Sequence, residues 1–87
     1  MSIVYSVTVK PDQDIEQNYV QWLQAEHIQE VVATGCFDDF RFFKVLAEDE
    51  RDGSSYNIQY VTTDMSRYFD YINIHAPLMR SKGKEKF

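Results

Sequence analysis

The two histidines of this chain are its candidates for chemistry near neutral pH, because imidazole is the side chain that titrates there. His27 shares a helical face with Val20, Leu23 and Val31, which predicts that it points at a sheet. A hydrogen-bonded core histidine is the favoured interpretation, and a ligand or general base is the alternative. His75 lies at a predicted helix end, where an imidazole can satisfy free carbonyl groups.

Aromatic and amide side chains supply the other candidates. Trp22 lies off the main apolar stripe of its helix, which favours a packing anchor or an interface contact. Tyr56 and Tyr60, with Asn57 between them, belong to one predicted strand and could line a pocket, with ordinary cross-strand pairing as the alternative. The candidate ligand-binding residues are therefore His27, His75, Trp22, Tyr56, Asn57 and Tyr60.

No catalytic or cofactor motif accompanies these residues. The sequence has no glycine-rich phosphate loop, no metal-ligand spacing and no nucleophile elbow. Cys36 is the single cysteine, which excludes an internal disulfide, and with two distant histidines it does not make a four-ligand zinc set. The sequence predicts no catalytic residue, no metal and no cofactor.

Charge and hydropathy restrict the class of protein further. The formal net charge is −5, so a phosphate backbone would be repelled and nucleic-acid binding is not expected. The basic cluster from Arg80 to Lys86 is interpreted as a solvated tail, and its charges also suit the end of a helix, because residues 78–87 are expected to form a fraying helical extension. No stretch approaches the roughly 20 apolar residues of a membrane span, and residues 1–10 are not expected to act as a signal peptide, because they contain no basic leader followed by a long apolar run. A cytoplasmic protein without membrane contact is expected.

The first half of the chain predicts a strand followed by a helix. Residues 3–10 alternate apolar and polar side chains, as a strand with one apolar face does. Residues 14–34 change to a helical period, with Asp12 or Asp14 as the expected N-terminal cap. Gly35 follows the last periodic residue, where a left-handed helix end favours glycine.

The second half predicts two strands and another helix. Strands are expected over residues 37–47 and 55–61, joined by a charged turn around Asp52-Gly53. Thr63 or Asp64 is expected to cap a helix, which Pro77 should end, kink or extend by a further turn. The apolar stripe expected on this helix consists of Met65, Tyr68, Phe69, Ile72, Ala76 and Met79.

The β-α-β-β-α order predicts an α+β fold of the ferredoxin-like βαββα(β) type over residues 1–87, one antiparallel sheet covered by two helices on one face. In this fold a last strand is expected after the second helix, paired beside the first strand, but the sequence shows none. A truncated sequence, a disordered strand or a partner subunit that covers the exposed edge would account for this difference. A domain this small is marginally stable alone, and its strands carry large apolar groups on both faces. A homodimer joined through the sheet face is expected.

Several segments together resemble a known family. These are residues 3–9, the helical run WLQAEHI at residues 22–28 followed by Glu30-Val31 and Thr34-Gly35, the strand YNIQY at residues 56–60, and HAP at residues 75–77. The chain resembles the DUF4286 family of small bacterial proteins of unknown function. The resemblance implies a dimeric α/β barrel, in which two ferredoxin-like sheets pack face to face, and a final strand that this chain lacks. It implies no reaction.

Two functions are compatible with these features. The first is a non-catalytic dimer that binds a small apolar ligand or a partner, as the surplus of aromatic residues suggests. The alternative is an enzyme like the cofactor-free monooxygenases, acting on a small apolar or aromatic compound between sheet and helices, with His27, His75, Tyr56 and Asn57 as its candidates. A cavity of about 300 Å³ or more lined by a histidine would favour the enzyme.

Overall fold

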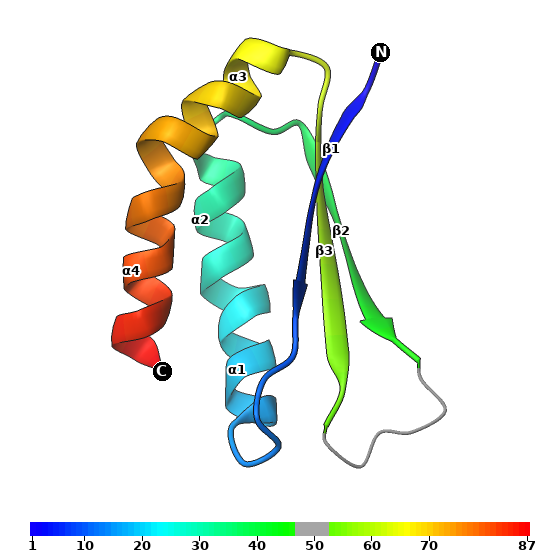
Figure 1. Cartoon of the computed structure of the whole chain (residues 1–87), viewed down its shortest axis with the longest axis vertical. Helices are drawn as coiled ribbons and strands as arrows, with labels where there is room; N and C mark the ends of the chain where they lie inside the picture. The colour runs from blue at the N-terminus through cyan, green and yellow to red at the C-terminus, as the bar shows by residue number, and fades with distance from the viewer. Residues whose placement is uncertain (47–52) are drawn as a thin grey trace.

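The computed structural model describes residues 1–46 and 53–87, whose elements follow the order β-α-β-β-α (Figure 1). Each of the two long helices contains a π-helical segment, η1 or η2, between two α-helical parts. The elements are β1 (Ile3–Val9), α1 (Glu16–Trp22), η1 (Leu23–His27), α2 (Ile28–Ala33), β2 (Asp39–Val45), β3 (Ser55–Thr62), α3 (Met65–Asp70), η2 (Tyr71–His75) and α4 (Ala76–Lys86). The predicted α+β class and element order are confirmed.

The three strands form one antiparallel sheet in the order β1-β3-β2, and both helices lie on the same face of it (Figure 1). Ile58 in the central strand is paired with Val7 on one side and Phe42 on the other. Tyr56, Ile58 and Tyr60 are buried beneath the helices, as the alternation in this strand predicted. The opposite face is open, and Val4, Phe43 and Val45 on it are 52%, 43% and 41% exposed.

The first helix begins at Glu16. Ile15 occupies its N-cap position, and no side-chain hydrogen bond caps the helix there. The prediction that Asp12 or Asp14 caps this helix is wrong. The backbone of the preceding turn satisfies Ile15 N–H instead, which donates to the carbonyl of Asp12 at 3.1 Å. At the other end Gly35 has φ +79°, the left-handed conformation that glycine adopts without strain, so this predicted helix end is confirmed.

Asp64 caps the second helix, as predicted, because its Oδ1 accepts the Ser66 backbone N–H at 2.9 Å. Pro77 lies in the first turn of α4, directly after η2, and the helix continues to Lys86. The predicted apolar stripe is wrong at its start, because Met65 and Phe69 are 49% and 54% exposed. Tyr71, which the stripe omitted, is buried instead.

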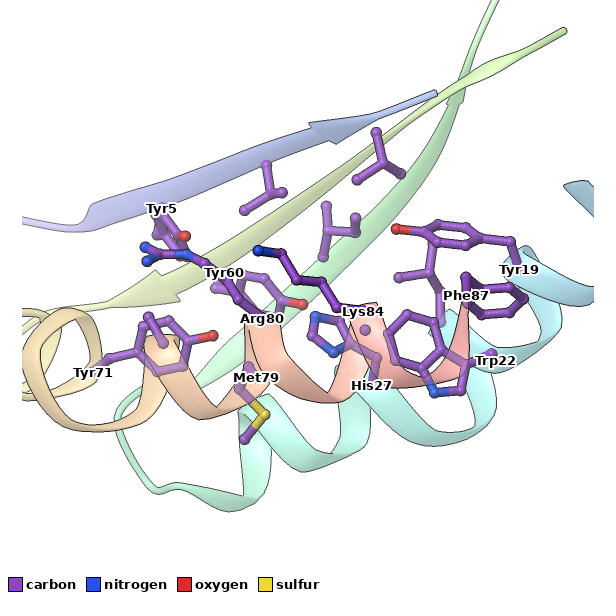
Figure 2. A pocket seen from close by; sticks show the side chains of 16 residues that line it. Tyr5, Tyr19, Trp22, His27, Tyr60, Tyr71, Met79, Arg80, Lys84 and Phe87 are labelled. Carbon is purple, nitrogen blue, oxygen red and sulfur yellow. The ribbon is translucent and has the colours of Figure 1, made fainter. Parts of the chain in front are cut away.

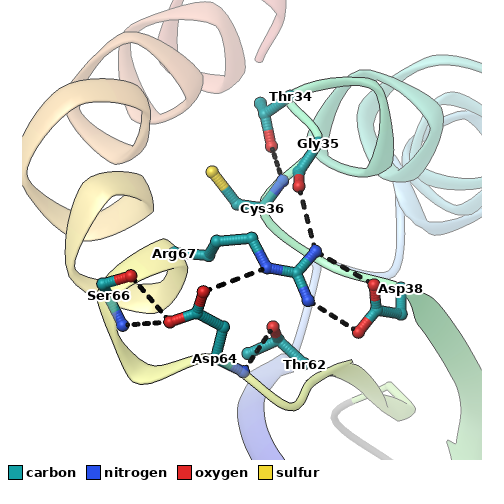
Figure 3. Close-up of polar contacts among 8 residues, drawn as sticks. All are labelled: Thr34, Gly35, Cys36, Asp38, Thr62, Asp64, Ser66 and Arg67. Atoms are coloured by element: carbon teal, nitrogen blue, oxygen red, sulfur yellow. Dashed lines mark hydrogen bonds and ion pairs between the residues drawn. The ribbon is translucent and has the colours of Figure 1, made fainter.

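A polar cluster joins the ends of three elements beside this cap (Figure 3). The Arg67 guanidinium donates to both carboxylate oxygens of Asp38 at 2.9 Å and to the carbonyl of Gly35 at 3.3 Å. This hydrogen bonding lowers the pKa of Asp38. Asp64 N–H donates in turn to Oγ1 of the fully buried Thr62 at 3.2 Å. The cluster therefore fixes the end of the first helix against the start of the second.

The strand bounds differ slightly from the predicted ones. β2 covers residues 39–45 rather than 37–47, because Phe37 lies in the core before the strand and Leu46, after it, is 84% exposed. The predicted turn around Asp52-Gly53 falls largely in residues 47–52, outside the described residues. Within the described ranges, no helix is long and apolar enough to cross a membrane.

Candidate functional site

A cavity of about 500 Å³ lies between the sheet and both helices, on the side of β1 (Figure 2). Aromatic and aliphatic side chains dominate its lining, which also includes one histidine and two cations. The lining residues are Tyr5, Val7, Val9, Tyr19, Trp22, Leu23, His27, Ile58, Tyr60, Tyr71, Ala76, Met79, Arg80, Gly83, Lys84 and Phe87. Its volume is within the range of about 300–1,000 Å³ that is typical of small-molecule sites.

One end of the cavity is walled by aromatic rings from both helices. The rings of Tyr19 and Trp22 on α1 lie 5.0 Å and 5.5 Å from the ring of Phe87. Gly83 on α4 faces this wall, because a β-carbon built there would lie in van der Waals contact with Trp22 Cη2, at 3.5 Å. This end of the cavity offers flat, polarisable surface to an apolar ligand.

His27 lies next to this aromatic wall and stacks on Trp22, with ring centroids 4.8 Å apart. Its Nδ1 is buried and has no hydrogen-bond partner within the described part of the chain. Burial lowers the pKa of His27, and nearby Lys82 acts in the same direction, whereas Glu30 opposes it. The imidazole is therefore neutral at pH 7, so it can accept a proton or a hydrogen bond.

Three tyrosines meet at the other end of the cavity. The Tyr5 ring centroid lies 6.0 Å from that of Tyr60 and 5.7 Å from that of Tyr71. Burial raises the pKa of Tyr60 far above its ordinary value and raises that of Tyr71 to about 12. Both phenols are thus protonated at physiological pH, and each can donate a hydrogen bond to a ligand.

The structure brings three of the six candidate residues together in this cavity. Trp22 and His27 come from the first helix and Tyr60 from β3. His27 was expected as a core histidine with a hydrogen-bond partner; its ring does face the sheet, but its Nδ1 is left unpartnered.

The other three candidates do not line this cavity. Tyr56 is on the same face of β3, but its hydroxyl donates to Glu16 Oε2 at 2.9 Å, near the start of α1. His75 contacts the ring of Tyr71 at 6.2 Å between centroids, outside the cavity. Tyr56 and His75 therefore make contacts that support the fold, with Glu16 and Tyr71 respectively.

Asn57 is on the open face of the sheet, because side chains alternate along β3. Its amide donates to Ser6 Oγ at 2.9 Å, to Thr8 Oγ1 at 3.1 Å and to the Val7 carbonyl at 3.3 Å. Asn57 therefore cross-links β3 to β1, which is the cross-strand pairing expected as the alternative to a pocket role.

Arg80 and Lys84 are functional candidates that sequence reasoning missed. The helical extension expected for this segment is confirmed, since α4 reaches Lys86, and both side chains are exposed; the role that was not expected is that they also line the cavity. Their spacing of four residues places them on one helix face, the same face as Ala76 and Gly83. This periodicity is the signal that could have identified them.

The described residues contain no group of three or more His, Cys, Asp or Glu side chains positioned to hold a metal ion. Comparison with known protein families matches residues 2–87 to DUF4286, a domain of unknown function. Neither a curated protein nor a solved structure matches the chain. Because the family match covers essentially the whole sequence, and includes the helix and strand that line the cavity, the chain belongs to the DUF4286 family.

Proposed function

We propose that this protein is a non-catalytic homodimer that binds a small apolar ligand in the cavity between its sheet and helices. The observation that carries the proposal is the cavity itself, about 500 Å³ in volume and walled by rings and aliphatic groups from β1, β3 and both helices. Side chains around an unfilled volume lose dispersion contacts, which costs stability in a domain this small. A ligand would restore those contacts.

The dimer would form through the open face of the sheet. Val4, Phe43 and Val45 expose large apolar surface there, opposite the face that the helices cover. The strand order β1-β3-β2 and the helices on one face support a ferredoxin-like arrangement, of which two copies would pack sheet to sheet as a dimeric α/β barrel. The second copy would remove the exposed apolar groups from water.

Fluorescence of the neutral dye N-phenyl-1-naphthylamine tests the cavity. Trp22 is the single tryptophan of the chain and lines the cavity, so bound dye should quench its emission by energy transfer. Gly83→Phe places a ring inside the cavity and should weaken dye binding about tenfold or more. Ser81→Phe is the matched control, because it adds the same ring to α4 at an exposed position outside the cavity.

Equal dye affinity in the two variants would overturn the assignment of this cavity as the binding site. Circular dichroism spectra that match the wild type would establish that both variants are folded.

Size-exclusion chromatography with light scattering tests the dimer. At micromolar concentration the mass should be twice the chain mass of 10.3 kDa. Phe43→Asp places a charge on the open face of β2, within the proposed contact, and should shift the protein to monomer. Ile74→Asp makes the same type of change on η2, where the side chain is 64% exposed, and should leave the dimer intact. A monomeric wild type would rule out the dimer.

Catalysis in the same cavity is the second candidate function. A cavity larger than about 300 Å³ and lined by a histidine was the feature expected to favour it, and His27 lines this one with an Nδ1 that has no partner among the described residues. A neutral imidazole in an apolar cavity can remove an acidic proton from a bound aromatic substrate, which is the base function that a cofactor-free monooxygenase requires. Oxygen uptake with an anthracenetriol as substrate, compared between wild type and His27→Gln, tests this. Equal uptake in both proteins would exclude His27 as the base.

A further inference from the structure

The charges that line the cavity have one sign, opposite to that of the whole chain. The protein carries a net charge of −5, yet the charged residues of the cavity lining are Arg80 and Lys84, and no described carboxylate joins them. Within residues 1–46 and 53–87, neither cation forms an ion pair, whereas Lys82, between them in sequence, binds Glu30 Oε2 at 2.8 Å. Two like charges four residues apart on a helix repel each other.

These cations lie across the opening of the cavity. Figure 2 shows the Arg80 and Lys84 side chains extending from α4 over the cavity toward the strands. The hydroxyls of Tyr60 and Tyr71 point into the same space, and neither forms a hydrogen bond within the described ranges. Two cations and two free phenolic donors therefore converge where a ligand could place an acceptor.

The opposite end of the cavity carries no cation, and its hydrogen-bond donors are the polar atoms of two aromatic side chains, the Tyr19 hydroxyl and the Trp22 indole N–H. Tyr19, Trp22 and Phe87 form the aromatic wall there, and Val7 and Val9 of β1 continue the apolar lining along the sheet. The cavity thus has a cationic end with two phenolic donors and a mainly apolar, aromatic end without a cation. A molecule that matches both ends is amphipathic and anionic.

We infer that the ligand of this cavity is a small monocarboxylic acid with an elongated or flat apolar body. Its carboxylate binds between Arg80 and Lys84 and accepts hydrogen bonds from the Tyr60 and Tyr71 hydroxyls. Its body lies along Val7, Val9 and the aromatic wall, next to Trp22. This inference rests on the proposed ligand-binding function and specifies the chemical class of the ligand.

Displacement of N-phenyl-1-naphthylamine by decanoate, decanol and decylamine, three probes of equal chain length used below their aggregation concentrations, tests the inference. Decanoate should bind about tenfold more tightly than decanol, because charge-assisted hydrogen bonds exceed neutral ones in strength. The advantage should shrink with added salt, since Arg80 and Lys84 are exposed to solvent. Decylamine should bind most weakly.

Variants of the two cations locate the effect. Arg80→Gln with Lys84→Gln should reduce decanoate affinity about tenfold and leave decanol affinity within about twofold. Lys82→Gln is the matched control, because it removes one charge from the same helix but faces Glu30, and it should preserve the preference for decanoate. Arg80→Glu with Lys84→Glu should reverse the preference toward decylamine.

The possible failures are distinguishable. If the neutral dye and decanol do not bind, the proposed function and this inference both fall. If they bind but decanoate gains nothing over decanol, or keeps its advantage in the double glutamine variant, the cavity is a neutral apolar site and the inference alone is overturned.

Discussion

Gly83 of α4 lies against the indole ring of Trp22, so that a β-carbon at residue 83 would sit 3.5 Å from Trp22 Cη2. That distance is an ordinary van der Waals contact, and the helix requires no positive φ at this glycine. Gly83→Ala should therefore raise the free energy of unfolding by about 0.5–1 kcal/mol, because alanine loses less backbone entropy in a helix. Urea denaturation measures the change. A loss of stability would mean that the contact with Trp22 cannot accommodate a methyl group.

Replacing Gly35 with alanine should change the free energy of unfolding in the opposite direction, although more space surrounds this glycine. No atom lies within 4 Å of a β-carbon built there, but its φ of +79° is a conformation that L residues with side chains disfavour. Gly35→Ala should lower the free energy of unfolding by about 1 kcal/mol. Gly35→Asn should lower it less, since asparagine tolerates the left-handed region better. Equal stability of the alanine variant and the wild type would contradict the role of Gly35 as a helix end.

The Arg67–Asp38 pair should stabilise the fold through its two parallel hydrogen bonds of 2.9 Å. Arg67→Lys removes the bidentate geometry and should lower the thermal midpoint, an effect that 1 M salt should diminish because the pair is exposed. Asp38 has its pKa lowered, chiefly by hydrogen bonding to Arg67, so its contribution is present above its ordinary pKa of 3.8 and is lost as the pH falls through the lowered value.

Thermal unfolding between pH 2 and pH 7 checks this prediction. The difference in midpoint between wild type and Arg67→Lys should be greatest at neutral pH and should vanish in strong acid. A difference independent of both salt and pH would indicate that Arg67 acts through packing of its aliphatic stem.

The order of elements could be predicted from the sequence because each depends on local signals. Neighbouring residues determine three of these features: the alternation around Ile58, the glycine helix end at Gly35 and the helix cap at Asp64. The structure confirms all three. By contrast, Asp12 and Asp14 have the right side chains for a cap, but the backbone turn before Ile15 leaves them outside that position.

The buried face of the second helix could not be predicted as well, because η2 changes the periodicity. A π-helical turn closes hydrogen bonds five residues apart and rotates the following residues relative to an α-helical pattern. The residues that face the sheet include Tyr68, Ile72, Ala76, Met79 and Gly83. Their average spacing is larger than the 3.6 residues of an α-helical turn. The errors of the predicted stripe lie at Met65 and Phe69, which precede η2 on α3, and at Tyr71, the first residue of η2.

The cavity depends on contacts between elements far apart in sequence, so spacing alone predicted it incompletely. Trp22, Tyr60 and Arg80 come from three elements and meet in the folded chain. The sequence identified the first two by residue type. It missed Arg80 because a basic cluster near a chain end is typical of a solvated helix end, and the helical extension was expected to fray rather than to pack against Trp22.

Protonation of His27 should destabilise the protein as the pH falls. Burial lowers the pKa of this imidazole from its ordinary value of 6.5, so the unfolded chain binds the proton first. The free energy of unfolding should therefore decrease as the pH drops below about 6.5, until the lowered pKa of the folded protein is reached. His27→Gln removes this titration, so the wild type should lose stability relative to the variant between pH 7 and pH 5.

An NMR titration of the His27 Cε1 proton, assigned by its absence in His27→Gln, gives the folded-state pKa directly. A value above 6.5 would reverse the expected slope and would show that Glu30 outweighs the effect of burial. Saturating the cavity with an apolar ligand should lower the pKa further, because the ligand would displace solvent from the imidazole.

The hydroxyl of Tyr56 should stabilise the junction between α1 and β3. It donates to Glu16 Oε2 at 2.9 Å, while the other oxygen of this carboxylate accepts the backbone N–H of the buried Ser54 at 3.3 Å. Tyr56→Phe deprives the half-buried carboxylate of one donor and should lower the free energy of unfolding by about 1–2 kcal/mol. Tyr68→Phe is the matched control, since the described residues include no hydrogen bond to the Tyr68 hydroxyl. Urea denaturation should place the control near the wild type, and equal losses in both variants would mean that the hydrogen bond to Glu16 contributes nothing beyond the general effect of removing a tyrosine hydroxyl.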